Sequence, residues 1–438
     1  MKRPTFPGGI HPADNKVSTA AKAIVACPLP DELIVPMQQH IGAPAECCVT
    51  VGRQVAKGEQ IGRAVGPVSV PIHAPTSGEV VAIEPRPHPV GRALPAVMIR
   101  PDGADRWHDD LQGSDPELLN PDELRQLLLQ AGIVGLGGAT FPTHIKLAPP
   151  PDRHIDTLII NGVECEPYLT GDHRLMVEEG PKIVDGILIL RRILEVDRVI
   201  LGIEDNKPDA IDVMRTLCAA TPIKVQPLPL KYPQGAEKQL IEAITGRQVP
   251  SGKLPMDCGA VVQNVGTACA VSTAVRQGQP LVERITTVTG AGIRNPQNLR
   301  VAIGTPLAHL IDQCDGFTDD PGKIILGGPM MGAAQISLAV PVIRGTSGLL
   351  VLRRKDIQLQ KPGPCIRCGR CVNVCPIRLQ PTVIALCARL GLVEKAEDHN
   401  ALDCIECGCC TYSCPATLPL VQSIREIKGT IMEHKRKQ

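Results

Sequence analysis

Two runs of cysteines near the end of the chain carry the residues best suited to chemistry. Both runs read C-x2-C-x2-C-x3-C-P, and their cysteines are Cys365, Cys368, Cys371, Cys375, Cys404, Cys407, Cys410 and Cys414. Thiolates bind both zinc and iron–sulfur clusters, and the number and spacing of the cysteines distinguish the two. A four-iron cube needs four thiolates from four directions. Three close cysteines can cover one face of it, so the fourth must come from elsewhere.

The spacing predicts two [4Fe–4S] clusters that exchange their fourth ligands. It is the pattern of bacterial two-cluster ferredoxins, in which the last cysteine of each run ligates the other cluster. We therefore assign Cys365, Cys368, Cys371 and Cys414 to one cluster, and Cys404, Cys407, Cys410 and Cys375 to the other. Zinc knuckles or a disulfide framework are the alternatives, but zinc would need only two C-x2-C pairs and neither proline. The motifs indicate a protein that transfers single electrons.

A glycine-rich stretch in the middle of the chain indicates a second binding site. It reads Gly135-Leu-Gly-Gly-Ala-Thr-Phe-Pro142, and Lys146 follows it. Glycines ahead of a helix leave backbone N–H groups free and let a ligand approach closely, as a phosphate requires. The stretch is neither a Walker A loop nor a G-x-G-x-x-G turn after a strand, and a simple tight turn is the alternative.

The segment after this stretch strengthens the prediction of a site. An apolar run at 156–160 is expected to be a strand, and Asn161-Gly-Val-Glu-Cys-Glu-Pro-Tyr168 follows its C-terminal end. Open α/β sheets bind ligands at that edge. Glu164 and Glu166 can therefore both face a pocket, although an acidic surface turn is the alternative. Further strands at 199–203 and 223–227, separated by helical segments, indicate a parallel sheet covered by helices.

Length and composition set the broad class of the protein. With 438 residues the chain is too long for one core, and its net charge of +1 gives no reason to expect a nucleic-acid partner. The ten cysteines outside the two ligand sets show no paired spacing, which fits a reducing cytoplasm. The N-terminus lacks the apolar core of a signal peptide, and no apolar run is long enough to span a bilayer.

These patterns predict a multidomain α/β and α+β protein. The expected segments are an N-terminal arm (1–20), a barrel-sandwich hybrid similar to lipoyl and biotinyl domains (21–105), an α/β domain (120–282), a β-grasp module (283–345) and a helical two-cluster domain (358–432). The barrel-sandwich part should contain short strands, at 23–26, 48–51, 60–63, 68–72, 79–83 and 96–100. It has no lysine between Ile61 and Pro71 that could be modified, so we expect a scaffold or docking surface.

Several single residues have expected structural roles. Asn120 should cap a helix that starts at Pro121, with Glu123 completing a capping box. Met330, Met331 and Cys409 are expected to pack, and His73 and His88 to be loop or hairpin histidines.

Taken together, the blocks resemble the C subunit of the Rnf electron-transport complexes over nearly the whole chain. The residues that carry this resemblance are Thr5-Phe-Pro-Gly-Gly-Ile-His-Pro12, the stretch 135–146, Asn161–Tyr168, Gln263-Asn-Val-Gly-Thr267 and the two cysteine motifs. The middle domain is also similar to the NADH-oxidising flavin subunit of respiratory complex I. That resemblance implies that residues 120–282 bind FMN non-covalently, with NADH stacked on it.

The resemblance to the complex I subunit also implies roles for individual residues. Gly135, Gly137 and Lys146 would hold the FMN phosphate and ribityl region, and Phe141 would stack on the dinucleotide. Asn161 and Glu164 would contact flavin, and Glu166 would contact the NADH ribose. The remaining cofactor-binding residues would be Gly138, Gly235, Glu237, Asn264 and Thr267. Three positions depart from the complex I pattern: Leu136 replaces an arginine, Val163 an aspartate and Ala236 a glutamate.

The resemblances together imply a path for electrons. NADH gives two electrons as hydride and clusters accept one at a time, so FMN must lie between them. The expected partners are an iron–sulfur B subunit and membrane subunits, in a complex that exchanges electrons between NADH and ferredoxin while moving Na⁺ or H⁺. The chain would be peripheral, on the cytoplasmic face of the inner membrane. The alternatives are a soluble flavin/iron–sulfur reductase of the cobalamin-reductase type and an electron-carrying scaffold that has lost FMN.

Overall fold

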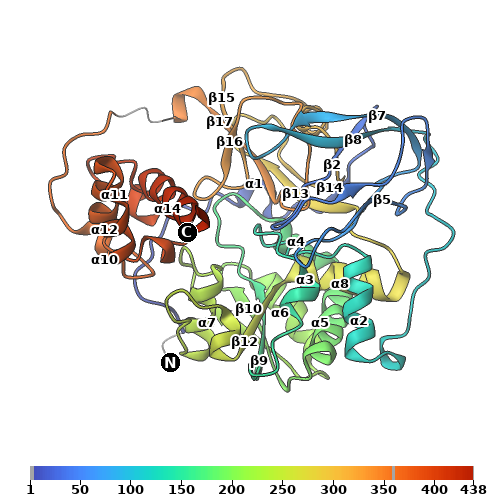
Figure 1. Cartoon of the computed structure of the whole chain (residues 1–438), viewed down its shortest axis with the longest axis horizontal. Coiled ribbons are helices and arrows are strands. Elements are labelled where there is room, and N and C mark those ends of the chain that lie inside the picture. The colour runs from blue at the N-terminus through green and yellow to red at the C-terminus, as the bar shows by residue number, and fades with distance from the viewer. Residues whose placement is uncertain (1–3, 358–360, 438) are drawn as a thin grey trace.

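Three packed modules and a projecting helical module make up the protein (Figure 1). The computed structural model describes residues 4–357 and 361–437. Residues 1–3 of the expected arm and residues 358–360 of the expected two-cluster domain lie outside the described residues. Among the described residues, no helix is both long and apolar enough to cross a membrane.

The barrel-sandwich module consists of two small antiparallel sheets. Their orders are β2-β8-β7-β4 and β3-β5-β6. The strands are β2 (Leu33–Pro36), β3 (Glu46–Cys47), β4 (Gln54–Val55), β5 (Gln60–Arg63), β6 (Ile72–His73), β7 (Gly78–Pro87) and β8 (Ala93–Pro101). Leu33, Ile61 and Val97 are fully buried between them. The strand expected at 48–51 is wrong, because β3 ends at Cys47 and Val49 is buried without joining a ladder.

The α/β module has the expected parallel sheet, in the order β11-β10-β9-β12. Its strands are β9 (Thr157–Gly162), β10 (Arg198–Glu204), β11 (Ile223–Leu228) and β12 (Ala260–Asn264). Its helices are α2 (Pro121–Gln130), α3 (Thr143–Lys146), α4 (Gly171–Glu178), α5 (Gly180–Leu194), α6 (Pro208–Cys218), α7 (Glu237–Thr245) and α8 (Val265–Gln277). The predicted capping box is confirmed, since Asn120 Oδ1 accepts from the Glu123 amide and the Glu123 carboxylate accepts from the Asn120 amide.

The β-grasp module is a six-stranded sheet in the order β1-β14-β13-β17-β15-β16. Its elements are β1 (Ile24–Ala26), β13 (Glu283–Thr289), β14 (Gln297–Ala302), β15 (Pro321–Leu326), β16 (Ala333–Gln335), β17 (Gly348–Arg353) and the helix α9 (Leu307–Asp312). Two expected boundaries are wrong. β1 falls within the segment expected to form the barrel sandwich but pairs with β14, and β17 lies beyond the expected end at residue 345.

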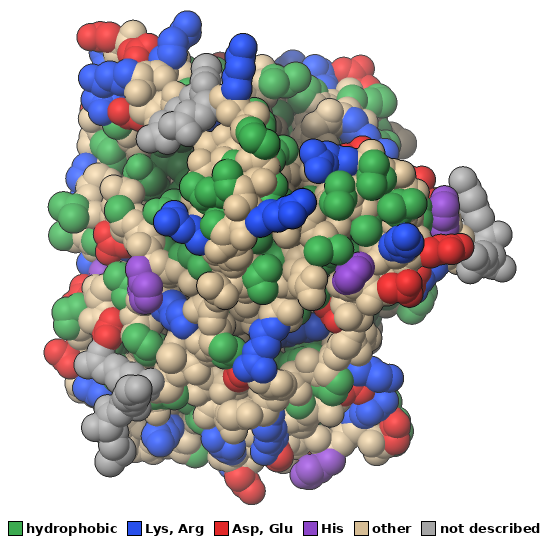
Figure 2. All heavy atoms as spheres, turned by 90° about the vertical axis from the view of Figure 1, so that its left-hand side faces the viewer, with side chains coloured by type: hydrophobic (Ala, Val, Ile, Leu, Met, Phe, Trp, Pro, Cys, Tyr) green, Lys and Arg blue, Asp and Glu red, His purple; other side chains and the backbone are tan. Residues whose placement is uncertain are grey.

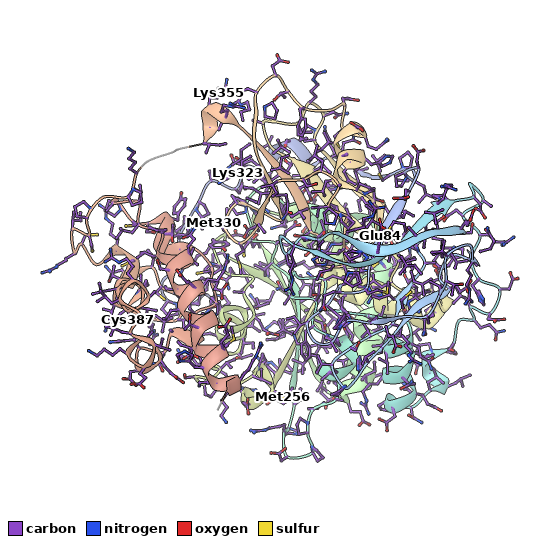
Figure 3. All side chains as sticks on the ribbon, turned by 45° about the horizontal axis from the view of Figure 1, so that its top comes forward. Glu84, Met256, Lys323, Met330, Lys355 and Cys387 are labelled. Carbon is purple, nitrogen blue, oxygen red and sulfur yellow. The ribbon has the colours of Figure 1, made fainter. Side chains whose placement is uncertain are left out.

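The C-terminal module is helical, as expected, and lies to one side of the others in Figure 1. Its helices are α10 (Arg370–Asn373), α11 (Pro381–Leu390), α12 (Val393–Asp398), α13 (Cys409–Tyr412) and α14 (Leu420–Lys437). Its core includes Ile384, Ile424, Ile427 and Cys387, which confirms that Cys387 is a core residue. Figure 3 shows Cys387 within this module and Met330 on the neighbouring part of the β-grasp module.

The N-terminal arm connects the modules. It ends in the short helix α1 (Val17–Ala20), and short 3-10 helices occur elsewhere, at Pro116–Leu118, Pro255–Cys258, Arg354–Asp356 and Ala401–Asp403. The Gly9 amide donates to the Val374 carbonyl of the C-terminal module at 2.9 Å. The Ile10 backbone pairs with that of Tyr232 in the α/β module. One extended segment thus contacts two modules that are far apart in sequence.

The close packing of α5 on α8 makes a testable prediction about stability. A Cβ atom on Gly186 would lie 1.8 Å from the Ala268 carbonyl oxygen, so Gly186→Ala must push the two helices apart. We expect a loss of about 3 kcal/mol in the free energy of unfolding, measured by urea unfolding followed by circular dichroism. Gly429→Ala in α14 is the matched control, because a Cβ there meets nothing within 4 Å and should stabilise the helix by about 0.5–1 kcal/mol. Equal midpoints for the two variants would contradict the prediction.

Candidate redox site

The glycine loop, residues 135–141, is closed at its base and open at its tip. The Gly135 amide donates to the Phe141 carbonyl at 2.9 Å, and Thr267 Oγ1 accepts from the Leu136 amide at 2.9 Å. Gly137 and Gly138 are exposed. Gly138 has a φ of +109°, which favours glycine, and a Cβ added there would meet nothing within 4 Å. The tip therefore presents bare backbone to open space, which fits a ligand that must approach closely.

A buried arginine from the β-grasp module holds the buried part of this loop. Arg284 of β13 donates through Nη2 to the Leu136 carbonyl at 2.8 Å and through Nη1 to the Arg344 carbonyl. Burial lowers the pKa of Arg284 to about 10, so it remains charged at neutral pH. Leu136 itself is only 7% exposed. The β-grasp sheet therefore fixes the position of the glycine loop.

The C-terminal ends of β9 and β12 bring two predicted flavin residues together. Asn161 and Asn264 are register partners in the parallel pair. Asn264 caps α8 by accepting from the Gly266 amide at 2.8 Å, and its Nδ2 donates to Asp172 at 2.7 Å. Asn161 donates to the Gly235 carbonyl at 2.9 Å. The predicted residues Asn161, Gly235, Asn264 and Thr267 therefore surround one edge of the sheet, beside the glycine loop.

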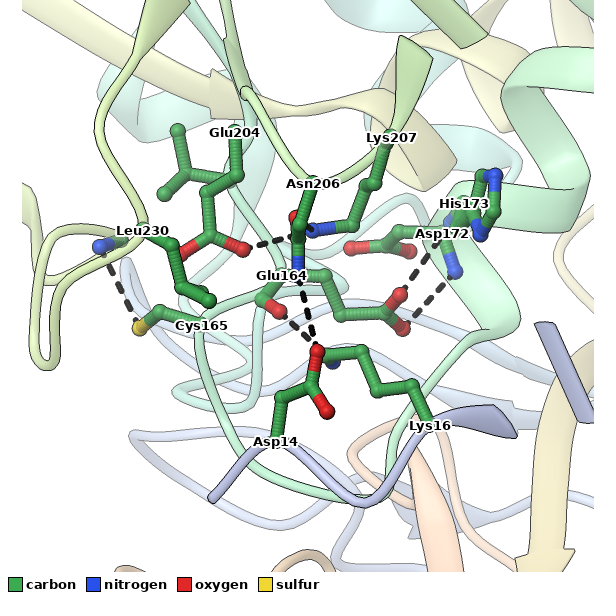
Figure 4. A network of polar contacts seen from close by, with 12 residues as sticks. Asp14, Lys16, Glu164, Cys165, Asp172, His173, Glu204, Asn206, Lys207 and Leu230 are labelled. Carbon is green, nitrogen blue, oxygen red and sulfur yellow. Dashed lines mark hydrogen bonds and ion pairs between the residues drawn. The ribbon is translucent and has the colours of Figure 1, made fainter. Parts of the chain in front are cut away.

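Lys16 of the arm fixes the segment that follows Asn161 (Figure 4). Lys16 is 5% exposed, and its ammonium group donates to the carbonyls of Glu164 at 2.9 Å, Glu166 at 3.0 Å and Leu169. Burial lowers the pKa of Lys16, while the nearby Glu164 carboxylate acts in the opposite direction. We call residues 161–169 the Asn161 loop.

The buried ion pair of Lys207 and Glu204, at 2.6 Å, lies next to this loop (Figure 4). Lys207 also donates to Asn206 Oδ1, and Asn206 donates to Asp14 Oδ2 of the arm at 3.3 Å. The arm, the Lys207–Glu204 pair and Asn206 thus form a polar network around the Asn161 loop, which restrains the path of its backbone.

The two glutamates of the Asn161 loop have different partners. Glu164 accepts from the first amides of α4, those of Asp172 at 3.0 Å and His173 at 3.2 Å. Glu166 accepts from the amides of Met330 at 2.6 Å and Met331 at 3.1 Å, in the β-grasp module. Burial raises the pKa of Glu166, and these amides act against that shift. Both carboxylates thus also hold elements in place, and the NADH role expected for Glu166 remains a prediction.

Lys146 and Glu237 form an ion pair between α3 and α7. Both side chains are partly exposed, and the phosphate contact expected of Lys146 remains a prediction. Phe141 is half-buried at the base of the glycine loop. The structure therefore brings all the predicted flavin residues to the α/β module, on or beside the glycine loop and the C-terminal edge of the sheet.

The cysteines of the two motifs line two separate cavities. The first cysteine cavity is lined by Cys365, Cys368, Cys371 and Cys414. The second cysteine cavity is lined by Cys375, Cys404, Cys407 and Cys410, together with Cys409. Four soft donors around one cavity fit the ligand set of an iron–sulfur cluster, and the exchange of the fourth cysteine matches the predicted assignment. Within the described ranges, no group of three or more His, Cys, Asp or Glu side chains would hold a single metal ion.

The two cavities differ in exposure. Cys365 and Cys368 of the first cavity are exposed, whereas Cys407 and Cys410 of the second are buried. Figure 2 views the side of the molecule that carries this module, and hydrophobic groups lie scattered over that face with Lys and Arg among them. The exposed apolar residues of the module include Ile366, Leu386, Leu390 and Tyr412. Cys409 is buried in an apolar cluster with Ile10 and also lines the second cavity, so its packing role remains a prediction. Met331 is 50% exposed and does not pack.

Family models match three modules. The model described as the RnfC barrel sandwich hybrid domain matches residues 4–104, the Nuo51 FMN-binding domain matches residues 128–273, and the SLBB domain matches residues 285–334.

Relatives match nearly the whole chain. It is 50% identical over 426 residues to the C subunit of the proton-translocating ferredoxin:NAD(+) oxidoreductase complex of Clostridium ljungdahlii, covering 97% of this chain and 93% of that protein. This chain belongs to the family of Rnf C subunits. It is 48% identical to the Na(+)-translocating counterpart of Acetobacterium woodii (100% and 99% covered) and 48% identical to the C subunit of the ion-translocating oxidoreductase complex of Rhodobacter capsulatus (97% and 83%). The family and the mixed α/β multidomain fold are thus confirmed, and an electron-transport role fits both.

Sequence reasoning missed four residues that shape the site: Lys16, Asp172, Tyr232 and Arg284. Each acts through one or a few long-range contacts. Tyr232 lies three residues before Gly235, a predicted site residue, and Lys16 lies four residues after the segment Thr5–Pro12. That proximity is the signal that could have revealed them.

Asp172 makes the stability of this region depend on pH. Burial, with the neighbouring Glu164 carboxylate, raises the pKa of Asp172 to about 7 from 3.8. The folded state then binds more protons than the unfolded state, so this contribution to stability falls as the pH rises from about 4 to about 7. Between about pH 6 and pH 8, the free energy of unfolding of the wild type should fall on the order of 1 kcal/mol further than that of Asp172→Asn. Urea unfolding at each pH measures this.

The control for this prediction is Asp212→Asn, since Asp212 is an exposed residue of α6. It should leave the pH dependence of the wild type unchanged. A pH dependence of Asp172→Asn equal to that of wild type would show that Asp172 does not carry the effect.

Proposed function

We propose that this chain oxidises NADH through FMN and passes the electrons singly, through two [4Fe–4S] clusters, toward partner subunits. The observation that carries the proposal is the pair of cysteine cavities, one buried beside the α/β module and the other exposed. The match of residues 128–273 to an FMN-binding domain supports the oxidation of NADH through FMN. Membership of the family of Rnf C subunits supports the transfer of electrons to partner subunits.

The residues of the α/β module would bind and orient the flavin. Gly137 and Gly138 leave room for the phosphate and ribityl chain, and Lys146 supplies a positive charge. Asn161 and Asn264 stand at the strand ends, where their side-chain amides hold Gly235, Asp172 and the start of α8 and so would shape the edge of the flavin site. When bound, FMN supplies the conversion between a two-electron hydride and single electrons. The protein's own part is to hold the two reactants in contact and exclude water.

Burial and contacts support an order for the two clusters. The second cysteine cavity contacts the α/β module, because the Tyr232 hydroxyl donates to the Cys407 carbonyl at 2.9 Å. The first cysteine cavity has two exposed cysteines and lies at the surface. Electrons from the flavin would therefore enter at Cys375, Cys404, Cys407 and Cys410 and leave through Cys365, Cys368, Cys371 and Cys414.

The exposed end of this path is where a partner would dock. Ile366, next to exposed Cys365, is 65% exposed, and Leu390 of α11 is 60% exposed. Apolar side chains around a redox centre suit a protein that must come close to exchange an electron. We infer that partner subunits of an Rnf-type complex, among them an iron–sulfur subunit, take electrons here while ferredoxin exchanges electrons indirectly. The chain would lie peripherally on the cytoplasmic face of the membrane, held by membrane subunits that couple electron flow to movement of an ion.

Flavin binding can be tested at Lys146. Lys146→Ala should raise the dissociation constant for FMN about tenfold or more, because it removes a charge-assisted contact to the phosphate. Flavin fluorescence titration of the purified chain measures this. Lys224→Ala, at an exposed position on β11, is the matched control and should bind FMN as wild type does.

The wild-type chain decides between the proposal and a scaffold without flavin. If it binds no FMN, and NADH does not bleach the cluster absorbance after anaerobic reconstitution, the dehydrogenase function is wrong. Co-purification with membrane subunits separates the Rnf role from a soluble reductase.

The cluster assignment can be tested with one cysteine from each cavity. Cys414→Ser and Cys375→Ser should each lose about half of the iron, but from different clusters, as seen by electron paramagnetic resonance. NADH should still rapidly reduce the cluster that remains in Cys414→Ser, and should reduce the one that remains in Cys375→Ser much more slowly. Cys409→Ser is the matched control and should keep both clusters, although Cys409 lies next to Cys410.

Loss of the same cluster in Cys414→Ser and Cys375→Ser would overturn the exchange of ligands. Equal rates of NADH-dependent reduction in the two variants would overturn the order of the clusters.

A further inference from the structure

Tyr232 lies where separate parts of the chain meet. Its ring is 2% exposed and packs in a small apolar cluster with Ile10, Cys407 and Cys409. Its backbone pairs with Ile10 of the arm in both directions, at 2.9 Å each. The α/β module, the arm and the cluster module are therefore all joined at this one side chain and its peptide groups.

The hydroxyl of Tyr232 contacts the second cysteine cavity directly. It donates to the carbonyl of Cys407 at 2.9 Å, and Cys407 lines that cavity. Cys407 and Gly408 lie on the loop that leads into α13, where Gly408 has a φ of +76°. A hydrogen bond to this carbonyl limits how the loop can move relative to the α/β module.

The β-grasp module closes the same junction from the other side. Gly408 lies next to Met330, since a Cβ added to it would be 3.2 Å from the Met330 carbonyl oxygen. The Met330 amide in turn donates to Glu166 at 2.6 Å. The Tyr232 hydroxyl also approaches the Glu166 carboxylate and counters part of the burial that raises the pKa of that group. Glu166 belongs to the Asn161 loop, so the junction reaches the predicted flavin site.

We propose that Tyr232 is a positioning residue, which holds the second cysteine cavity at a fixed separation from the Asn161 loop through its hydroxyl contact with Cys407 and its packing beneath Ile10. The proposal rests on the proposed function in one respect: the distance matters because electrons would cross this junction. The cluster module has a hydrophobic core of its own, separate from those of the other modules. The position of the second cysteine cavity relative to the α/β module must therefore be set by contacts between the modules, such as the one that Tyr232 makes.

The decisive variant is Tyr232→Phe, which keeps the ring and its packing and removes only the hydroxyl. In the full chain with reconstituted clusters, we expect hydrogen exchange of the amides at 404–410 to rise about threefold to tenfold, the range that one lost hydrogen bond gives. Reduction of the flavin by NADH should keep its wild-type rate, while reduction of the clusters should slow by several-fold. Tyr232→Leu should enlarge both effects, because it also removes ring packing.

Tyr412→Phe is the matched control. It makes the same change within the cluster module, on a side chain that is 58% exposed, and should leave exchange and electron transfer unchanged. The proposal is overturned if Tyr232→Phe matches wild type in the exchange of residues 404–410, or if the flavin step slows as much as the cluster step.

Failure of the proposed function gives a different result. If NADH reduces neither flavin nor clusters in the wild type, the function is wrong, and the exchange experiment still decides whether Tyr232 seats the second cysteine cavity. Exchange at 404–410 that increases in Tyr232→Phe would then support the positioning role alone.

Discussion

The ammonium group of Lys16 is the contact on which the geometry of the site depends. Three backbone carbonyls, those of Glu164, Glu166 and Leu169, converge on it in a region almost closed to solvent. Each carbonyl would cost about 1–3 kcal/mol if it were buried without a partner, and the ammonium would cost more. Lys16 and the Asn161 loop are therefore stable only together, so the arm has to fold against the α/β module before the site has its shape.

The Asn161 loop, which Lys16 fixes, contacts three other elements. Glu164 holds the start of α4, Glu166 holds the Met330 turn of the β-grasp module, and Asn161 holds Gly235 near the start of α7. Tyr232, three residues before Gly235, contacts the cluster module. Cofactors that exchange electrons need a fixed separation, and rigid support from several elements provides it better than a single flexible loop. Because the Asn161 loop contacts several modules at once, it can keep them at a fixed separation.

The sequence reveals those features that depend on local spacing. The exchange of Cys375 and Cys414 follows from motif spacing, and the parallel sheet follows from apolar runs such as 156–160. The residues of the short strand β1 do not indicate which strand it pairs with, so its pairing with β14 instead of the barrel strands could not be predicted. Lys16 and Arg284 act through a few contacts with residues far away in sequence, and no periodic pattern marks such residues.

The departures from the complex I pattern at Leu136 and Val163 also have a physical explanation. Leu136 is 7% exposed and packs in the core beneath the sheet, and Val163 is 3% exposed and packs in a second core on the α7 side. Neither side chain faces the open tip of the glycine loop, where Gly137 and Gly138 are bare. The apolar side chains at 136 and 163 add to these two cores, where polar side chains would have to find buried partners. The two substitutions therefore lie in the cores that support the loop and leave the exposed backbone of Gly137 and Gly138 in place.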